Sequence, residues 1–254
     1  KVLYQQLLLW IQMATSFWTL CNPNIRVETT TKKFFGKFLY KLVVYVAGGR
    51  SIDSRRGIEE SINHRRSQQH LHTGSWWWQH RNPNLEKANI DLLKKVKELK
   101  DNRKNLNILV RIEEPHIQIY SESLDQLEKI VCEYFNNYQT LLTAISWPAS
   151  ELSAEVLNSG AIIRRSDIGH SHKIILRDGK YSREVKESIL NYLESLGDEI
   201  VKIPPSLSGT LTRSSSYIWN GYFYTSEPDI VSFLNLMDPN LVLNIHELVV
   251  LPHK

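Results

Sequence analysis

Cysteine is scarce in this sequence, and its scarcity excludes several classes of protein. Only Cys21 and Cys132 occur among 254 residues, too few for a disulfide framework or an all-cysteine zinc site. Two buried, reduced thiols are the simplest interpretation, and they favour a cytoplasmic, reducing environment. Long hydrophobic runs are also missing. The apolar part of residues 1–12 is about half as long as a membrane span, so we expect no membrane partner.

Charge of one sign does not dominate either. The formal net charge is +4, from 31 basic and 27 acidic residues, which permits a polyanionic partner without demanding one. The chain contains no phosphate-cradling glycine-rich loop, no G-x-S-x-G elbow and no H-E-x-x-H pair. From these absences we expect no cofactor, and a protein that binds its target rather than one that transforms it.

One pattern occurs twice in the chain. "IQIYSESLDQLEKI" at 117–130 and "YFYTSEPDIVSFLNL" at 222–236 each read as a strand that runs into a helix. In both, a hydroxyl residue suited to cap the helix precedes apolar residues at helical spacing. Ser123 and Gln126 have the spacing of a capping box, which predicts a side-chain cap at the first of these helices.

The repeat extends over both halves of the chain. Each copy reads β-α-β-β-α-β, the order of the ferredoxin-like fold, in which four antiparallel strands carry two helices on one face. We predict an α+β protein of two tandem ferredoxin-like units that arose by internal duplication. The matching segments are strands 40–50 and 172–182, helices 89–100 and 185–197, strands 107–115 and 199–205, and the last strands 140–148 and 241–251.

The domain boundaries follow from this alignment of the copies. The second copy lacks the insertion of the first and has a longer loop at 204–216. Residues 1–12 precede Met13 and read as upstream sequence. We expect an N-terminal arm at 1–35, a first unit at 36–148 with an insertion at about 50–84, a linker helix within 149–170, and a second unit at 171–254.

The insertion has the most unusual composition. Six arginines stand there against three carboxylates, a net charge of +3, beside four histidines and three consecutive tryptophans. Arginine neutralises phosphates through its forked guanidinium, and indole rings stack on unpaired bases. We therefore predict a clamp for single-stranded or structured nucleic acid, RNA ahead of DNA. The alternative is an insertion that folds back, with its tryptophans between the two copies. The clamp residues are Arg55, Arg56, Arg65, Arg66, Trp76, Trp77, Trp78 and Arg81.

The open sheet faces are the second candidate surface. Alternation along each strand puts Tyr120 on the face away from the helices, with Tyr222 and Tyr224 in the equivalent positions of the second copy. Lys41 and Lys173 share these faces from the neighbouring strands. Tyrosines flanked by cations resemble the arrangement with which RNA-recognition motifs stack bases. Alternatively, the faces bury their tyrosines against a protein partner or a second copy, as in a viral or phage accessory protein with an assembly role.

Two H-x-H pairs, His70 with His72 and His170 with His172, have the spacing with which a strand presents two imidazoles to one metal. Polar residues flank the first pair where strand residues would be needed. We therefore expect these histidines to lie at the surface or in loops, and we expect no metal.

A nuclease is the remaining alternative. "HLH" at 70–72 is also the motif of HUH-type nicking nucleases, which have a ferredoxin-like core, and "FWTLCNP" at 17–23 resembles the first motif of viral replication initiators of that family. The resemblance implies a tyrosine nucleophile. Tyr134 or Tyr138 would have to serve, without the Tyr-x-x-Lys motif of the family. Tandem ferredoxin-like units also occur in CRISPR RNA-processing endonucleases, whose glycine-rich C-terminal loop this sequence lacks.

Overall fold

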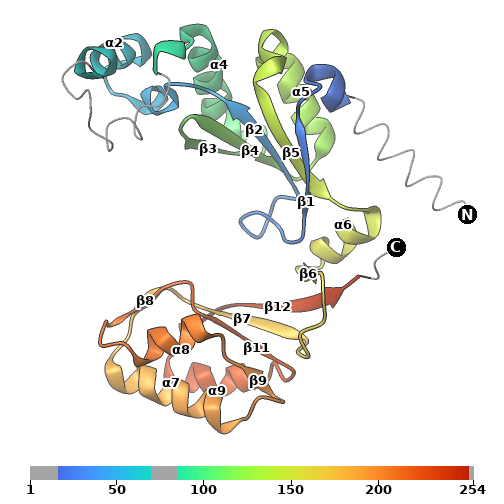
Figure 1. Cartoon of the computed structure of the whole chain (residues 1–254), viewed down its shortest axis with the longest axis vertical. Helices are drawn as coiled ribbons and strands as arrows, with labels where there is room; N and C mark the ends of the chain where they lie inside the picture. Colours follow the sequence, from blue (N-terminus) through green and yellow to red (C-terminus); the bar gives the residue numbers. More distant parts are fainter. Residues whose placement is uncertain (1–16, 70–84, 252–254) are drawn as a thin grey trace, which may run out of the picture. The chain divides into compact units, whose positions relative to one another are not determined.

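The computed structural model describes residues 17–69 and 85–251. The chain divides into two compact units, residues 1–154 and 155–254. Each unit contains a five-stranded sheet with helices packed on it (Figure 1), so the prediction of a mixed α+β fold is confirmed. Helix α6 (Glu151–Asn158), where a linker helix was predicted, lies at the boundary between the units.

The first sheet has the strand order β1-β5-β2-β4-β3. Strand β2 pairs antiparallel with β5 and β4, β3 pairs antiparallel with β4, and β1 runs parallel to β5. The strands are β1 (Arg26–Thr30), β2 (Tyr40–Tyr45), β3 (Leu109–Glu113), β4 (His116–Ser121) and β5 (Leu142–Pro148). The helices are α2 (Ile58–Gln69), α4 (Ile90–Asp101) and α5 (Leu124–Tyr134), with the 3-10 turns η1 (Gly49–Asp53), η3 (Leu85–Lys87), η4 (Asn102–Lys104) and η5 (Asn136–Leu141).

Alternation along β4 decides which side of this sheet becomes the core. Ile117 and Ile119 are fully buried and belong to the cluster that includes the apolar residues of α4 and α5. The side chain of Asn89 caps α4 by accepting the Leu92 N–H at 3.0 Å. The predicted side-chain cap by Ser123 on α5 is wrong, because the Ser123 side chain makes no capping bond there.

The described part of the predicted N-terminal arm is built into the first unit. Residues 17–21 form a helical turn, and β1 follows it as an edge strand beside β5. Trp18 is fully buried in the core, and Asn22 Nδ2 donates to the carbonyls of Thr140 and Leu142 at 3.1 and 2.7 Å. An amide that satisfies two carbonyls at the start of β5 fixes the path of the arm.

The second sheet has the strand order β6-β12-β7-β11-β9. Strand β7 pairs antiparallel with β11 and β12, β9 pairs antiparallel with β11, and β6 runs parallel to β12. The strands are β6 (Ile162–Arg164), β7 (His172–Leu176), β9 (Val201–Lys202), β11 (Tyr222–Thr225) and β12 (Val242–Val250), with a separate ribbon of β8 (Gly179–Lys180) and β10 (Tyr217–Ile218). The helices are α7 (Arg183–Ser195), α8 (Pro205–Thr212) and α9 (Ile230–Met237).

The second core, like the first, is formed by alternate strand residues that face the helices. Ile174 and Phe223 are fully buried on the side of the sheet that carries α7, α8 and α9, and these three helices do not cover the other side, which we call the open face (Figure 1). One charged residue, Lys186 on α7, is also buried. Its Nζ donates to the carbonyls of Arg213 and Ser215 at 2.6 and 2.8 Å, which holds the segment between α8 and β10.

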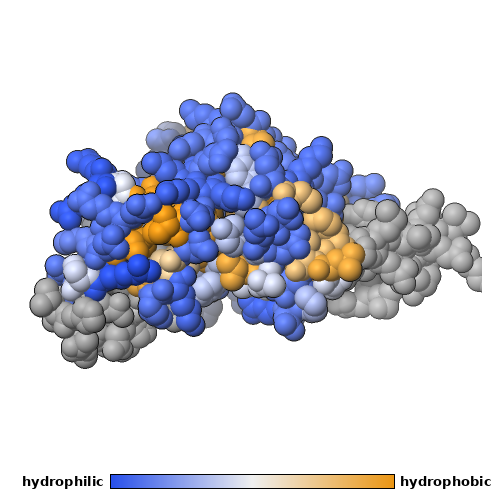
Figure 2. Space-filling model, turned by 90° about the horizontal axis from the view of Figure 1, so that it is seen from above, coloured by the Kyte–Doolittle hydropathy of each residue, from blue (hydrophilic) through white to orange (hydrophobic). Residues whose placement is uncertain are grey.

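The surface agrees with the composition of the chain. Hydrophilic residues cover most of the face seen in Figure 2, and hydrophobic residues gather there in small areas. Within 17–69 and 85–251, no helix combines the length and the apolar character needed to cross a membrane.

Candidate nucleic-acid interface

Arg65, a member of the predicted clamp, is held inside the first unit. Its Nη2 lies 2.9 Å from both carboxylate oxygens of Glu114, and its Nη1 donates to Ser51 Oγ at 3.0 Å. The Arg65 side chain is 14% exposed and that of Glu114 only 1%. The Gly48 N–H donates to the same carboxylate at 2.9 Å. A guanidinium engaged in this way has little capacity left for a phosphate.

The other described arginines of the clamp differ in their surroundings. Arg55 and Arg56 are exposed in the turn that leads into α2. Arg66 Nη2 lies 3.4 Å from the carbonyl oxygens of both Leu85 and Glu86, which ties α2 to η3. The remaining predicted residues, Trp76, Trp77, Trp78 and Arg81, lie outside the described residues, as do His70 and His72.

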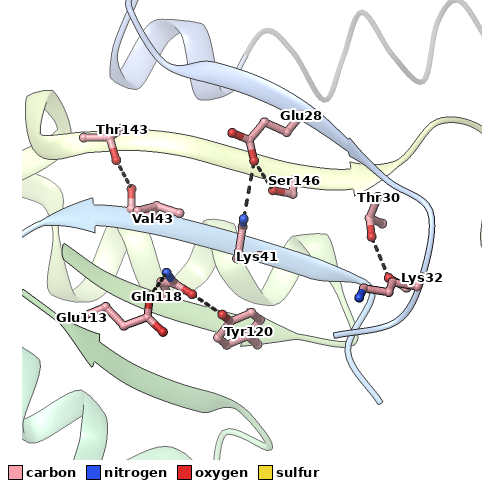
Figure 3. A network of polar contacts seen from close by, with 10 residues as sticks. All are labelled: Glu28, Thr30, Lys32, Lys41, Val43, Glu113, Gln118, Tyr120, Thr143 and Ser146. Atoms are coloured by element: carbon pink, nitrogen blue, oxygen red, sulfur yellow. Dashed lines mark hydrogen bonds and ion pairs between the residues drawn. The ribbon is translucent and has the colours of Figure 1, made fainter. Parts of the chain in front are cut away.

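The open face of the first sheet carries a polar network (Figure 3). Lys41 Nζ lies 3.5 Å from Glu28 Oε2, which also accepts a hydrogen bond from Ser146 Oγ at 3.1 Å. On the neighbouring strands, Gln118 Nε2 donates to Glu113 Oε2 at 2.7 Å. Carboxylates thus stand beside the cations and amides of this face, which lowers its attraction for a polyanion.

Tyr120 lies on this face, but it is covered. The ring centroids of Phe34, Phe35 and Phe38 lie 5.4, 5.0 and 6.3 Å from that of Tyr120. Phe35 and Gly36 both have positive φ, 54° and 69°, as a type I′ turn requires, so the segment folds tightly back over the sheet. Tyr120 is 4% exposed as a result, and its ring has no free face for a base.

The tyrosines of the second sheet are placed differently. Tyr222 and Tyr224 are both half-buried, and their ring centroids lie 5.5 Å apart at an interplanar angle of 73°. Phe223 between them points into the core and is fully buried, so β11 is anchored from its other side. Two aromatic rings therefore stand on the open face of a rigid strand, where bases stack in RNA-recognition motifs.

Cations from three other strands of the sheet, β7, β6 and β9, lie near these rings. Lys173 Nζ lies 3.8 Å from the Tyr222 ring centroid, within the range of a cation–π contact. The Arg164 guanidinium lies 5.8 Å from the Tyr224 ring, and its Nη1 is 3.4 Å from the Tyr224 hydroxyl. Lys202 is exposed and is the cross-strand neighbour of Tyr224. Arg164 Nε is buried and lacks a hydrogen-bond partner among the described residues.

The two faces therefore differ in charge. The first carries Glu28 and Glu113 beside its cations, whereas the strand positions around Tyr222 and Tyr224 contain no carboxylate among the described residues. Those positions are Arg164, Lys173, Ile175, Lys202, Asn244 and His246. A cationic face with aromatic rings and without an acidic side chain at its described strand positions suits a phosphate-bearing ligand.

The Tyr224 phenol on this face carries no charge at neutral pH. Burial, reinforced by the nearby Tyr222 hydroxyl, raises the pKa of Tyr224 above its ordinary value. The sign follows because burial disfavours the phenolate. Tyr224 therefore offers a neutral ring and adds no negative charge that would repel a phosphate.

The two imidazoles of the second H-x-H pair bond to different hydroxyl groups. His170 is buried and its Nδ1 lies 3.2 Å from Ser226 Oγ, whereas His172 Nδ1 lies 2.8 Å from Ser171 Oγ. Over the part of the chain that the structure describes, no three His, Cys, Asp or Glu residues gather as metal ligands would. Burial, followed by the charge of Lys202, lowers the pKa of His170.

The segments that resemble replication initiators are parts of the first core. Trp18 of "FWTLCNP" is fully buried, and Cys21 of the same segment is also buried. Tyr134 is 4% exposed, and its hydroxyl accepts a bond from Asn102 Nδ2 at 3.4 Å. Tyr138 packs against the core from η5. Core packing and a hydrogen bond thus explain the positions of these residues, which the nuclease alternative would require at a reactive site.

Two residues near the second face were missed in the sequence. Arg164 belongs to the segment that was read as a linker, and only its pairing through β6 brings it to Tyr224. Trp219 is 65% exposed just before β11, and an isolated exposed tryptophan in a turn gives no pattern to detect. Comparisons with protein-family models, curated proteins and solved structures find no match to this chain.

Proposed function

We propose that this protein binds single-stranded nucleic acid, RNA in preference to DNA, on the open face of its second sheet. The observation that carries the proposal is the pair Tyr222 and Tyr224 on one strand, flanked by Lys173, Arg164 and Lys202 with no carboxylate in the strand positions between them. Bases stack on the two rings, and the cations neutralise the phosphates that connect them.

We further propose that both units are ferredoxin-like and arose by duplication. Strand β2 lies next to the last strand β5 of the first unit, and β7 lies next to the last strand β12 of the second. Each sheet also adds an edge strand parallel to that last strand. A shared order of this kind supports a common origin, because independent packing solutions have no reason to repeat the additional strand. The two open faces then diverged, one covered by aromatic side chains and one left cationic.

The insertion contributes to binding in this proposal through its exposed arginines. Arg55 and Arg56 have the exposure that a phosphate contact needs, whereas Arg65 is engaged by Glu114. We therefore assign Arg55 and Arg56 a supplementary, sequence-independent contribution to affinity. The second sheet carries the stacking contacts.

Fluorescence anisotropy with labelled RNA and DNA of about 20 nucleotides, titrated with the full chain at two salt concentrations, tests the proposal. Replacing Tyr222 and Tyr224 together by alanine is expected to weaken binding by at least about tenfold, since each stacked base contributes about 1–3 kcal/mol. Tyr120→Phe is the matched control, because this tyrosine is covered. Absence of salt-sensitive binding by the unaltered protein at low salt would overturn the proposal.

One observation favours a second candidate, assembly with another copy of the chain. Phe233 and Leu236 on α9 and Leu243 and Ile245 on β12 are exposed, and α9 packs against β12. Strand β6 pairs with β12 only at residues 248–250, so in the described chain the outer edge of β12 before that point has no strand partner. An exposed strand edge beside apolar side chains is a template for pairing with the same edge of a second copy.

Sedimentation velocity distinguishes this candidate from a monomeric binder. Leu243→Lys puts a charge on the edge strand and is expected to convert a dimer to a monomer, because charged edge residues oppose strand pairing. Leu20→Lys in the first unit is the control for removing an exposed apolar residue elsewhere. If the unaltered protein sediments as a monomer at high micromolar concentration, the proposal that it assembles with another copy is refuted.

A further inference from the structure

An aromatic pair stands at the surface immediately before β11. The Trp219 side chain is 65% exposed, and its ring centroid lies 5.1 Å from that of Tyr217 at an interplanar angle of 38°. Large aromatic rings are normally buried, since each removes a large apolar area from water. A largely exposed indole held against a half-buried tyrosine ring therefore offers a surface on which a planar ligand can stack.

The ribbon that carries the pair is firmly anchored. Ile218 of β10 is fully buried in the second core, so Tyr217 of the same strand projects to the other side, and the Trp219 ring lies against Tyr217. Lys180 is the cross-strand neighbour of Tyr217 in the β8–β10 ribbon, and it is exposed. A cation thus shares a face with the aromatic pair.

The backbone turn after Trp219 is fixed by a hydrogen bond and by close packing. Asn220 has a φ of +48°, and its N–H donates to Asp178 Oδ1 at 2.7 Å. A Cβ on Gly221 would lie 2.8 Å from Ile218 Cγ2, so only glycine allows the backbone to pass this close. Asp178, which accepts this bond, lies between β7 and β8 and places one carboxylate beside the turn.

The pair lies within reach of the tyrosine site. Three residue steps separate Trp219 from Tyr222, so their Cα atoms are at most about 11 Å apart. A stacked strand rises by about 3.4 Å per nucleotide, so this distance corresponds to about three nucleotides. A single strand lying on Tyr224 and Tyr222 would therefore need about three more nucleotides to reach Trp219.

We propose that Trp219, backed by Tyr217, is a further base-stacking platform that extends the single-strand site of the second sheet, with Lys180 meeting a phosphate. This inference rests on the proposed function and adds to it a longer ligand: a strand that spans both the tyrosine pair and the indole. Indole stacking is tolerant of base identity, so the extension increases affinity without adding a sequence preference.

The test uses the full chain and fluorescently labelled oligouridylates of increasing length, with anisotropy as the readout. For the unaltered protein, affinity is expected to rise at the length that first reaches from Tyr224 to Trp219. Trp219→Ala should abolish that rise, a loss of about tenfold for long strands, and leave the shortest strands bound as before. Trp219→Phe should restore most of the rise, because a phenyl ring also stacks.

Leu236→Ala provides the matched control, since Leu236 is also highly exposed (82%) but lies on α9, on the helix side of the sheet. If Trp219→Ala binds like the unaltered protein at every length while the Tyr222 and Tyr224 double variant is weakened, the inference is overturned and the proposed function stands. An equal loss at all lengths would also overturn the extension. If the unaltered protein binds no strand of any length, the proposed function fails and the inference fails with it.

Discussion

Arg65 and Glu114 form a buried ion pair in which one guanidinium nitrogen lies 2.9 Å from both carboxylate oxygens. Glu114 is in the turn between β3 and β4, and Arg65 is on α2, 49 residues earlier in the chain. Arg50 Nε lies 3.6 Å from the same carboxylate. The pair therefore fixes the position of α2, the helix of the predicted clamp, against the edge of the first sheet.

Glu114→Gln is expected to destabilise the first unit by about 3 kcal/mol, because it leaves the Arg65 charge buried without a counter-charge. Urea denaturation monitored by circular dichroism measures the change. The double replacement of Arg65 by Met and Glu114 by Leu should recover much of the loss, since two apolar side chains need no compensation. Glu59→Gln, in the exposed pair with Lys94, is the control and should leave stability unchanged. A Glu114→Gln midpoint equal to that of the unaltered protein would refute the structural role of the pair.

The ion pair of Arg65 with Glu114 is a contact that the sequence could not reveal. In the sequence it is one of several arginines beside histidines and tryptophans, and that composition is typical of phosphate contacts. Its partner Glu114 lies in a different element, so local pattern gives no sign of the pair. Tyr120 shows the same limit: strand alternation correctly puts it on the open face, but its cover comes from residues 34–38, far away in the chain.

The buried strand residues and the main helices could be predicted because their signals are local in the sequence. Ile117 and Ile119 alternate with polar residues, and both are fully buried. The helices expected at 89–100 and 185–197 occur as α4 and α7 with small differences at their ends, because apolar spacing and the capping residues Asn89 and Ser182 are local signals. The edge strands β1 and β6 were missed. Each is a short segment of mixed composition that becomes a strand because it pairs with a neighbouring strand, β5 or β12, and its own sequence gives no strand pattern.

Lys186→Met is expected to destabilise the second unit by about 1–3 kcal/mol. The ammonium is buried and donates to the carbonyls of Arg213 and Ser215, so methionine leaves two acceptors without a donor, while the relief of a buried charge offsets part of the cost. Thermal unfolding measures the difference. Lys180→Met, at an exposed position of the same unit, should have no effect. A stabilised Lys186→Met protein would mean that the desolvation of the ammonium outweighs its two hydrogen bonds.

Acid is expected to weaken the second unit through His170. Burial and the charge of Lys202 lower its pKa, although Asp198 and Asp167 oppose this shift. The unfolded state then binds the proton more readily, so stability is fully present above the unfolded pKa of about 6.5 and is lost as the pH falls below it. His170→Asn should flatten the dependence of unfolding free energy on pH between about 7 and 5. His64→Asn, at an exposed position, should leave the slope unchanged, and an equal slope for both variants would contradict the assignment.

The two sheets offer a matched pair of lysines that isolates the electrostatic part of the proposed function. Lys202 is the cross-strand neighbour of Tyr224 on the second open face, and Lys41 is the cross-strand neighbour of Tyr120 on the first. Lys41 stands beside Glu28 at 3.5 Å, whereas no carboxylate occupies the strand positions around Lys202 in the described sheet. Lys202→Gln should therefore weaken binding of single-stranded RNA and reduce the slope of log affinity against log salt by about 0.7, the contribution of one phosphate contact. Lys41→Gln should change neither quantity. Anisotropy titrations over a range of salt concentrations give both slopes, and equal slopes for Lys202→Gln and the unaltered protein would place the phosphates away from this face.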